Sequence, residues 1–130
     1  MILDTSALIA ILEQEDDARL FARVIADANL LKLSAPTYLE TAMVLSRRKK
    51  SDALVKLNDL IEVAQIEIIP FTGEAAYAAT QAFSHFGKGQ GHAAQLNFGD
   101  CMSYAVSKIE GLPLLFKGDD FRKTDVECAI

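Results

Sequence analysis

The sequence has little of what marks disulfide scaffolds, zinc sites and membrane proteins. It contains only two cysteines, two histidines and three prolines in 130 residues. Cys101 and Cys128 lack zinc-ligand spacing with the histidines, so both are expected to be reduced, structural thiols. No apolar stretch reaches the roughly 20 residues that cross a bilayer, and no basic segment precedes the apolar start as in a signal peptide. We therefore expect a cytoplasmic protein with no membrane partner.

An excess of positive charge is also missing. The net charge of −5 and the pI near 4.9 argue against a protein that binds nucleic acid through its overall field. They do not exclude a nuclease, because divalent cations bound by carboxylates become the largest local charge. The one basic run, residues 47–50, closes a predicted helix. It is either a solvated helix end that suits the helix dipole or a contact for RNA or an acidic partner.

What the chain does have is 51% hydrophobic residues, arranged in short runs that alternate with helical periodicity. This content fits a single domain over residues 1–130, and the alternation predicts an α/β fold around a mostly parallel sheet. The irregular stretch 87–99 is expected to cross the domain between two helices. Strands are predicted at 1–4, 31–35, 66–71 and 113–116, and helices at 6–13, 15–28, 36–48, 51–64, 73–86 and 99–110.

Acidic residues occupy positions that this topology brings together. Asp4 follows the first predicted strand, and Asp119 and Asp120 follow the last. Glu40 lies on a helix that follows a strand, and Asp100 opens a helix that leads into one. All these positions belong to the carboxyl edge of a parallel sheet, where such sheets bind ligands. Because clustered like charges are costly unless protonated or bound to cations, the pattern predicts a metal site.

Each acid also has a purely structural explanation. Asp4 could cap the first helix, and Asp100 could be a first-turn acid that suits the helix dipole. Glu40 could be an exposed helical residue, and Asp119 and Asp120 could form a turn after a strand. None of these explanations accounts for the shared edge.

The donors at this edge favour one kind of chemistry. Carboxylate oxygens, with no Cys and His at zinc-ligand spacing, favour Mg²⁺ or Mn²⁺ over zinc. An ion held by Asp4 and Asp100 would activate a water and neutralise charge on a phosphate, with Glu40 in the outer shell or positioning the water. Asn97 is expected to shape the turn that aims Asp100. His85 or His92 would need a paired base to act as a general acid, and the sequence offers none.

Four segments, in this order, resemble the PIN-domain ribonucleases, and within them the VapC toxins of type II toxin–antitoxin systems. The resemblance covers essentially the whole chain and implies a PIN fold, a central mostly parallel sheet of four to five strands between helices in an α/β/α sandwich. The segments are MILDTSALIAIL at 1–12, SAPTYLE at 34–40, LNFGDC at 96–101 and LLFKGDDF at 114–121, followed by Thr124-Asp125.

The resemblance also implies site residues. Asp4, Glu40 and Asp100 would form the acidic triad that holds Mg²⁺ or Mn²⁺, with Thr5 or Ser6 assisting. Together with Asn97, these two hydroxyl residues are expected to assist substrate binding.

The fourth acid departs from the family pattern. Many PIN sequences carry Thr-x-Asp after the last parallel strand, which would place that acid at Gly118 here. Asp119 and Asp120 therefore both remain catalytic candidates, Asp119 as a metal ligand and Asp120 with a structural role.

The function that the resemblance implies is a metal-dependent endoribonuclease that cleaves single-stranded or loop RNA. Its partners would be a VapB-like antitoxin and a second copy of the chain, with operator DNA reached only through the antitoxin. The apolar faces of helices 15–28 and 51–64 exceed what one sheet face needs, which indicates a homodimer or an antitoxin groove.

Three alternatives can be compared with the residues, and the sequence argues against the last two. The first is a catalytically silent PIN-like module that acts by sequestering a partner. A phosphoaspartyl phosphatase would need an acid where Ser6 stands, and a receiver domain would need one after the strand that ends at Phe71.

Overall fold

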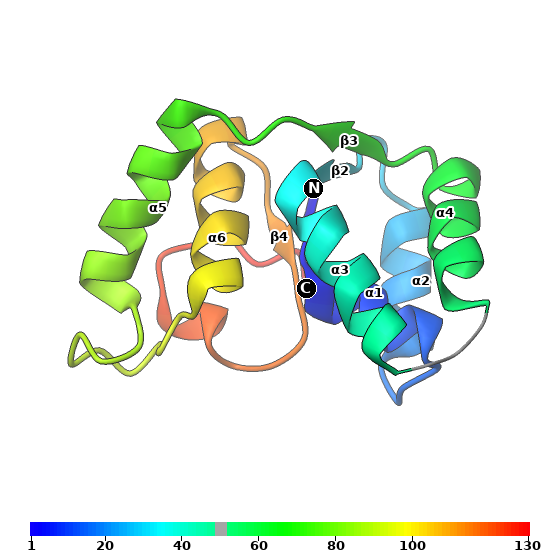
Figure 1. Cartoon of the computed structure of the whole chain (residues 1–130), viewed down its shortest axis with the longest axis horizontal. Coiled ribbons are helices and arrows are strands. Elements are labelled where there is room, and N and C mark those ends of the chain that lie inside the picture. Colours follow the sequence, from blue (N-terminus) through cyan, green and yellow to red (C-terminus); the bar gives the residue numbers. More distant parts are fainter. Residues whose placement is uncertain (49–51) are drawn as a thin grey trace.

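The computed structural model describes residues 1–48 and 52–130 and has the predicted order of elements, βααβααβααβ (Figure 1). Ser51, the expected start of one helix, and Lys49 and Lys50 of the basic run lie outside the described residues. The elements are β1 (Ile2–Leu3), α1 (Thr5–Leu12), α2 (Ala18–Ala26), β2 (Lys32–Ser34), α3 (Ala35–Arg47), α4 (Ala53–Val63), β3 (Glu67–Ile69), α5 (Gly73–Phe86), α6 (Phe98–Glu110), β4 (Leu114–Leu115) and a 3₁₀ turn, Phe121–Lys123.

The strands form one parallel sheet in the order β3-β2-β1-β4. Beyond β4, Leu114 also forms a parallel bridge with Cys128, so the chain's last residues extend the sheet. The observed strands are shorter than the predicted ones because capping residues and a proline end them. Asp4 and Ser34 already cap the following helices, and Pro70, which has no amide hydrogen, follows β3 directly.

The sheet separates two hydrophobic cores, which confirms the α/β/α sandwich. Successive strand residues point to opposite faces, so Leu3 and Leu115 pack with α1 to α4, whereas Ile2 and Leu114 pack with α5 and α6. In Figure 1 the pair α5 and α6 stands at one end of the molecule and α2 and α4 stand at the other. None of the helices within residues 1–48 and 52–130 combines the length and apolarity needed to cross a membrane.

The prediction for residues 87–99 is wrong. This stretch does not cross the domain, because α5 and α6 lie side by side and run in opposite directions (Figure 1). Its ends are hydrogen-bonded to each other: Lys88 N donates to Leu96 O at 2.9 Å, and Leu96 N donates to Phe86 O at 2.9 Å. Gly89 and Gly91 adopt positive φ angles of 84° and 80° that let the chain reverse. The segment is a closed loop that delivers α6 to the carboxyl edge of the sheet.

Candidate active site

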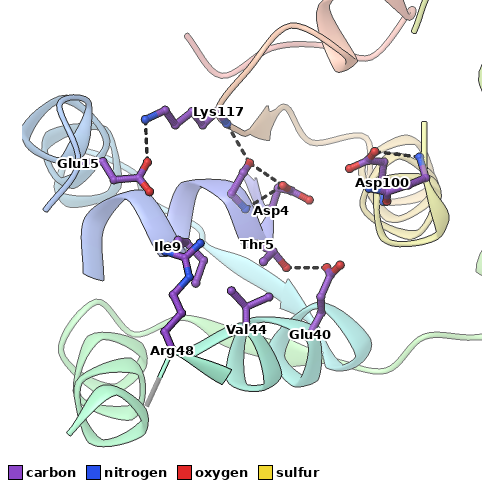
Figure 2. A pocket seen from close by; sticks show the side chains of 11 residues that line it. Asp4, Thr5, Ile9, Glu15, Glu40, Val44, Arg48, Asp100 and Lys117 are labelled. Carbon is purple, nitrogen blue, oxygen red and sulfur yellow. Dashed lines mark hydrogen bonds and ion pairs between the residues drawn. The ribbon is translucent and has the colours of Figure 1, made fainter. Parts of the chain in front are cut away.

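One pocket of about 380 Å³ at the carboxyl edge of the sheet collects six of the predicted site residues. Figure 2 shows Asp4, Glu40 and Asp100 reaching it from three separate elements, namely the end of β1, α3 and the first turn of α6. The structure thus brings together three acids that lie far apart in the sequence, as the topology predicts. The lining residues are Asp4, Thr5, Ser6, Ile9, Glu15, Glu40, Val44, Arg48, Asn97, Asp100 and Lys117.

Asp4 is the most deeply buried of these acids, with 4% of its surface exposed. Its Oδ2 accepts hydrogen bonds from Ser6 N at 3.0 Å and Ser6 Oγ at 2.6 Å, and its Oδ1 accepts one from Ser103 Oγ at 2.7 Å. The capping role of Asp4 is therefore real, and it coexists with the position in the pocket. All three donors are uncharged, so they orient the carboxylate without neutralising it.

Ser103 contacts Asp4 although it was not among the predicted site residues. It is buried and one helical turn beyond Asp100, on the same side of α6. That spacing of three residues from a predicted site acid is the signal that identifies it.

Glu40 is held by a chain of hydroxyl groups. Thr5 Oγ1 donates to Glu40 Oε2 at 2.7 Å, and the buried Thr41 Oγ1 lies 3.2 Å from Thr5 Oγ1. On its other side, Glu40 meets the first turn of α6 at Gly99. A Cβ atom at Gly99 would lie 2.4 Å from Glu40 Oε1, so only glycine allows this approach without moving the carboxylate.

Asp100 takes part in a capping box at the start of α6. Asn97 N donates to Asp100 Oδ2 at 2.9 Å, and Asp100 N donates to Asn97 Oδ1 at 2.9 Å. Burial, followed by the charges of Asp4, Asp120 and Glu40, raises the pKa of Asp100 to about 6, against the lowering effect of the Asn97 amide. The acids therefore repel one another even though they do not touch.

Neither candidate for the predicted fourth site acid lines the pocket. Asp119 and Asp120 are both exposed, and Asp120 precedes the 3₁₀ turn and lies 3.9 Å from Lys123 Nζ in an ion pair. Gly118 gives the turn before them a φ of 103°. Since the charge of Asp120 contributes to the raised pKa of Asp100, Asp120 is coupled electrostatically to the pocket.

The residues fit a hard divalent cation in donor type and in charge. The acids that meet at the pocket offer only oxygen ligands, and a cation would relieve the repulsion that raises the pKa of Asp100. Within residues 1–48 and 52–130, no three Asp, Glu, His or Cys side chains are close enough to share one ion. Different partners hold the carboxylates apart: serines hold Asp4, Thr5 holds Glu40, and Asn97 holds Asp100.

Two cations also line the pocket, and the sequence assigned neither to it. Arg48 follows the last turn of α3, and Lys117 follows β4. The signal for Lys117 was its place directly after the last apolar strand, beside the pair of acids. For Arg48, contact with RNA was only one of several interpretations of the basic run.

A family model tests the resemblance. The model described as "PIN domain" matches residues 1–127 of the chain. The chain belongs to the PIN-domain family.

Similar proteins that are named VapC ribonucleases place this PIN domain among the VapC proteins. Ribonuclease VapC28 of Mycobacterium tuberculosis is 46% identical over 130 residues, which is 100% of this chain and 98% of that protein. Ribonuclease VapC of Mycolicibacterium smegmatis is 44% identical over 126 residues, with 97% of each chain covered. The predicted membership of the VapC group is thus confirmed.

Solved structures show the same fold at low sequence identity. The Mycobacterium tuberculosis toxin VapC20, described as cleaving the Sarcin-Ricin loop, superposes with a TM-score of 0.76 at 19% identity and covers 96% of this chain and 95% of its own. VapBC2 from Rickettsia felis, bound to a promoter DNA fragment, gives 0.75 at 18% identity and covers 98% and 94%. The fold is shared although four in five residues differ.

The raised pKa of Asp100 predicts a pH dependence of stability. An acid whose pKa is higher in the folded state binds more protons there, so in the presence of a chelator its contribution to stability falls as pH rises from about 4 to about 6. Asp100→Asn should abolish this fall and stabilise the protein at pH 7 by about 1 to 2 kcal/mol, allowing for solvent screening. Urea unfolding at several pH values measures it.

The matched control is Asp59→Asn, which removes one exposed charge from α4. Its unfolding curve should keep the pH dependence of the unaltered protein. An Asp100→Asn protein that loses stability with pH as steeply as the control would contradict the assignment.

Proposed function

We propose that this PIN domain is a divalent-metal-dependent endoribonuclease, the toxin of a VapBC-type toxin–antitoxin system, that cleaves single-stranded or loop RNA. The observation that carries the proposal is the meeting of Asp4, Glu40 and Asp100 at one pocket, in a chain related over its whole length to proteins named VapC ribonucleases. The oxygen-only donors support Mg²⁺ or Mn²⁺ as the cofactor.

The proposed ligands are Asp4 and Asp100, with Glu40 in the outer shell and Asp120 as the fourth acid in preference to Asp119. The preference rests on the charge of Asp120, which raises the pKa of Asp100. When bound, the ion would activate water and stabilise charge on the phosphate.

The protein's own contribution is orientation. Ser6 and Ser103 fix the two oxygens of Asp4, so that a buried carboxylate faces the pocket in one rotamer. Thr5 holds Glu40 at the pocket, where its carboxylate can position the attacking water. Asn97 sets the direction of Asp100 through the capping box. Fixed donors of this kind lower the reorganisation needed during in-line attack.

We also propose two protein partners, a VapB-like antitoxin and a second copy of the chain, with operator DNA bound only through the antitoxin. Helices α2 and α4 bury Phe21 and Leu57 in the core but leave Leu20, Val55 and Val63 exposed, which supports a protein partner on this side. A separate apolar surface surrounds Phe98, whose side chain is 81% exposed between two apolar hollows, and supports a self-contact.

Asp4→Asn and Asp100→Asn should each abolish RNA cleavage, by at least about a hundredfold, because each removes a charge that would hold the cofactor. Purified protein is incubated with single-stranded and structured RNAs in Mg²⁺, in Mn²⁺ and in EDTA. Cleavage should require the metal, and circular dichroism should show both variants folded.

Thermal unfolding with increasing Mn²⁺ separates catalysis from metal binding. The unaltered protein should be stabilised by the ion and Asp4→Asn should not. Full cleavage by both variants would reject the site. A protein that neither cleaves RNA nor binds the metal would instead be the catalytically silent binding module.

Gly99→Ala should lower activity while leaving the fold stable. The added Cβ would lie 2.4 Å from Glu40 Oε1, so the flexible carboxylate must move away from its position beside Thr5. We expect a loss of activity of about tenfold or more, with a change in unfolding free energy below about 1 kcal/mol, since alanine also favours the helix. Initial cleavage rates and urea unfolding measure the two effects.

Gly73→Ala at the start of α5 is the matched control, because an added Cβ meets no atom within 4 Å there. Its cleavage rate should equal that of the unaltered protein. Equal rates for both alanine variants would show that the position of Glu40 does not matter.

A further inference from the structure

The pocket has a cationic side that the metal site does not use. Figure 2 shows Arg48 and Lys117 on the side away from Asp100, each reaching the pocket from a different element. The protein is acidic, with a net charge of −5, and an RNA ligand adds several negatively charged phosphates. A metal at the reacting centre can balance only part of the charge on these phosphates. Cations on the pocket wall are where a neighbouring phosphate can be held.

Arg48 already forms an ion pair within the protein. Its guanidinium pairs with the carboxylate of Glu13, whose side chain is only 11% exposed. Removing one member of a largely buried ion pair leaves an uncompensated charge, which is strongly unfavourable. Arg48 is therefore held at a largely buried carboxylate, and moving it to a phosphate would break that ion pair.

Lys117 is bound differently. Its ammonium lies 2.7 Å from Glu15 Oε2 and 3.4 Å from Asp17 Oδ2, and these side chains are 33% and 46% exposed. Exposed ion pairs contribute little stability, and both acids can be hydrated by water if the ammonium leaves. Hydrogen bonding to Glu15, and then to Asp17, raises the pKa of Lys117, so the side chain is cationic at neutral pH.

The backbone of Lys117 is tied to the centre of the site. Its amide donates to Ser6 Oγ at 2.9 Å, and Ser6 Oγ donates to Asp4 Oδ2 at 2.6 Å. One hydroxyl thus separates the Lys117 backbone from the buried carboxylate. The base of the side chain is fixed relative to Asp4, while its flexible four-carbon stem can carry the ammonium to a ligand in the pocket.

We propose that Lys117 binds a phosphate of the RNA adjacent to the scissile one, and that Glu15 and Asp17 hold its ammonium when no RNA is present. The two acids act as phosphate mimics that keep the side chain extended at the pocket. The inference rests on the proposed function only in naming RNA as the ligand. It makes Lys117 a substrate-binding residue and not part of the metal site.

Salt dependence of RNA binding tests the contact directly. The Asp100→Asn background keeps the RNA intact, and fluorescence anisotropy with a labelled single-stranded RNA gives Kd across a series of salt concentrations. Lys117→Gln should reduce the slope of log Kd against log[salt] by about 0.7 and weaken binding about threefold, as expected for one lost contact to a single-stranded phosphate. Lys117→Arg should retain the slope.

Lys108→Gln is the matched control. Like Lys117, Lys108 forms an exposed ion pair, here with Asp125 at 3.1 Å, but it lies near the other end of α6 from Asp100. The Lys108→Gln substitution removes the same charge from the protein as Lys117→Gln, but at a position that does not line the pocket. Its salt slope should equal that of the parent, whereas an equal loss in both variants would mean that only overall charge matters and would overturn the proposal.

Glu15→Gln provides a test in the opposite direction. Releasing Lys117 from its partner should tighten RNA binding by about two- to threefold, since one competing anion is lost. The gain should disappear when Lys117→Gln is also present, and this double-mutant cycle separates local release from the general loss of a negative charge. An equal gain in both backgrounds would overturn the competition between Glu15 and phosphate.

Cleavage kinetics distinguish this proposal from the proposed function. With Asp100 intact, Lys117→Gln should raise KM while kcat stays within about twofold, because the contact is made before and during reaction. If the protein cleaves RNA but its Kd for RNA is the same in all the Lys117 and Glu15 variants, the Lys117 proposal alone is refuted. A protein that binds RNA through Lys117 but never cleaves it would refute the ribonuclease proposal alone.

Discussion

The burial of one unneutralised carboxylate governs the arrangement of this site. Asp4 leaves β1 at the centre of the sheet, and only hydroxyl and amide groups donate to its oxygens in the described contacts. Uncharged donors replace the water that the carboxylate loses, but they leave its charge to act on its neighbours. The pKa of Asp100 is raised chiefly by its own burial and further by this charge, and the affinity we expect for a cation has the same origin.

Two of the acids at the site also take part in the contacts that begin helices. Asp4 caps α1, Ser34 caps α3, and Asn97 with Asp100 caps α6. In a parallel sheet these helix starts gather at the carboxyl edge, where their unpaired amides favour negative charge. The explanations of Asp4 as a cap and of Asp100 as a first-turn acid were therefore correct, and they are compatible with the positions of both acids in the pocket. Glu40, by contrast, is only partly exposed. A single side chain can end a strand, start a helix and face the pocket.

The two hydrophobic cores can be built from many different apolar residues. Leu3 and Leu115 on one face, and Ile2 and Leu114 on the other, need only be apolar and alternate along the strands. This explains how VapC20 superposes with a TM-score of 0.76 although 19% of the sequence is identical. The constraint on particular residues falls instead where backbone or side chains approach closely, as at Gly99 beside Glu40.

The sequence by itself determined the order of elements, the parallel sheet and the edge on which the acids meet. These follow from local periodicity and from the rule that parallel strands end on one side, so Asp4, Glu40 and Asp100 could be placed together without coordinates. Strand ends were less accurate, because caps such as Ser34 compete with the strand for the same residues. The loop after α5 was misplaced, because periodicity does not reveal that α5 and α6 run in opposite directions.

Only the tertiary structure decided which side chains complete the site. Ser103 reaches Asp4 across 99 residues of sequence, and Lys117 meets Glu15 across 102. Contacts of this kind depend on rotamers and on how helices pack on the sheet, which local patterns do not encode. Our proposed preference for Asp120 over Asp119 also needs the folded chain. It rests on a long-range electrostatic coupling of Asp120 to Asp100, which exists only once the chain is folded.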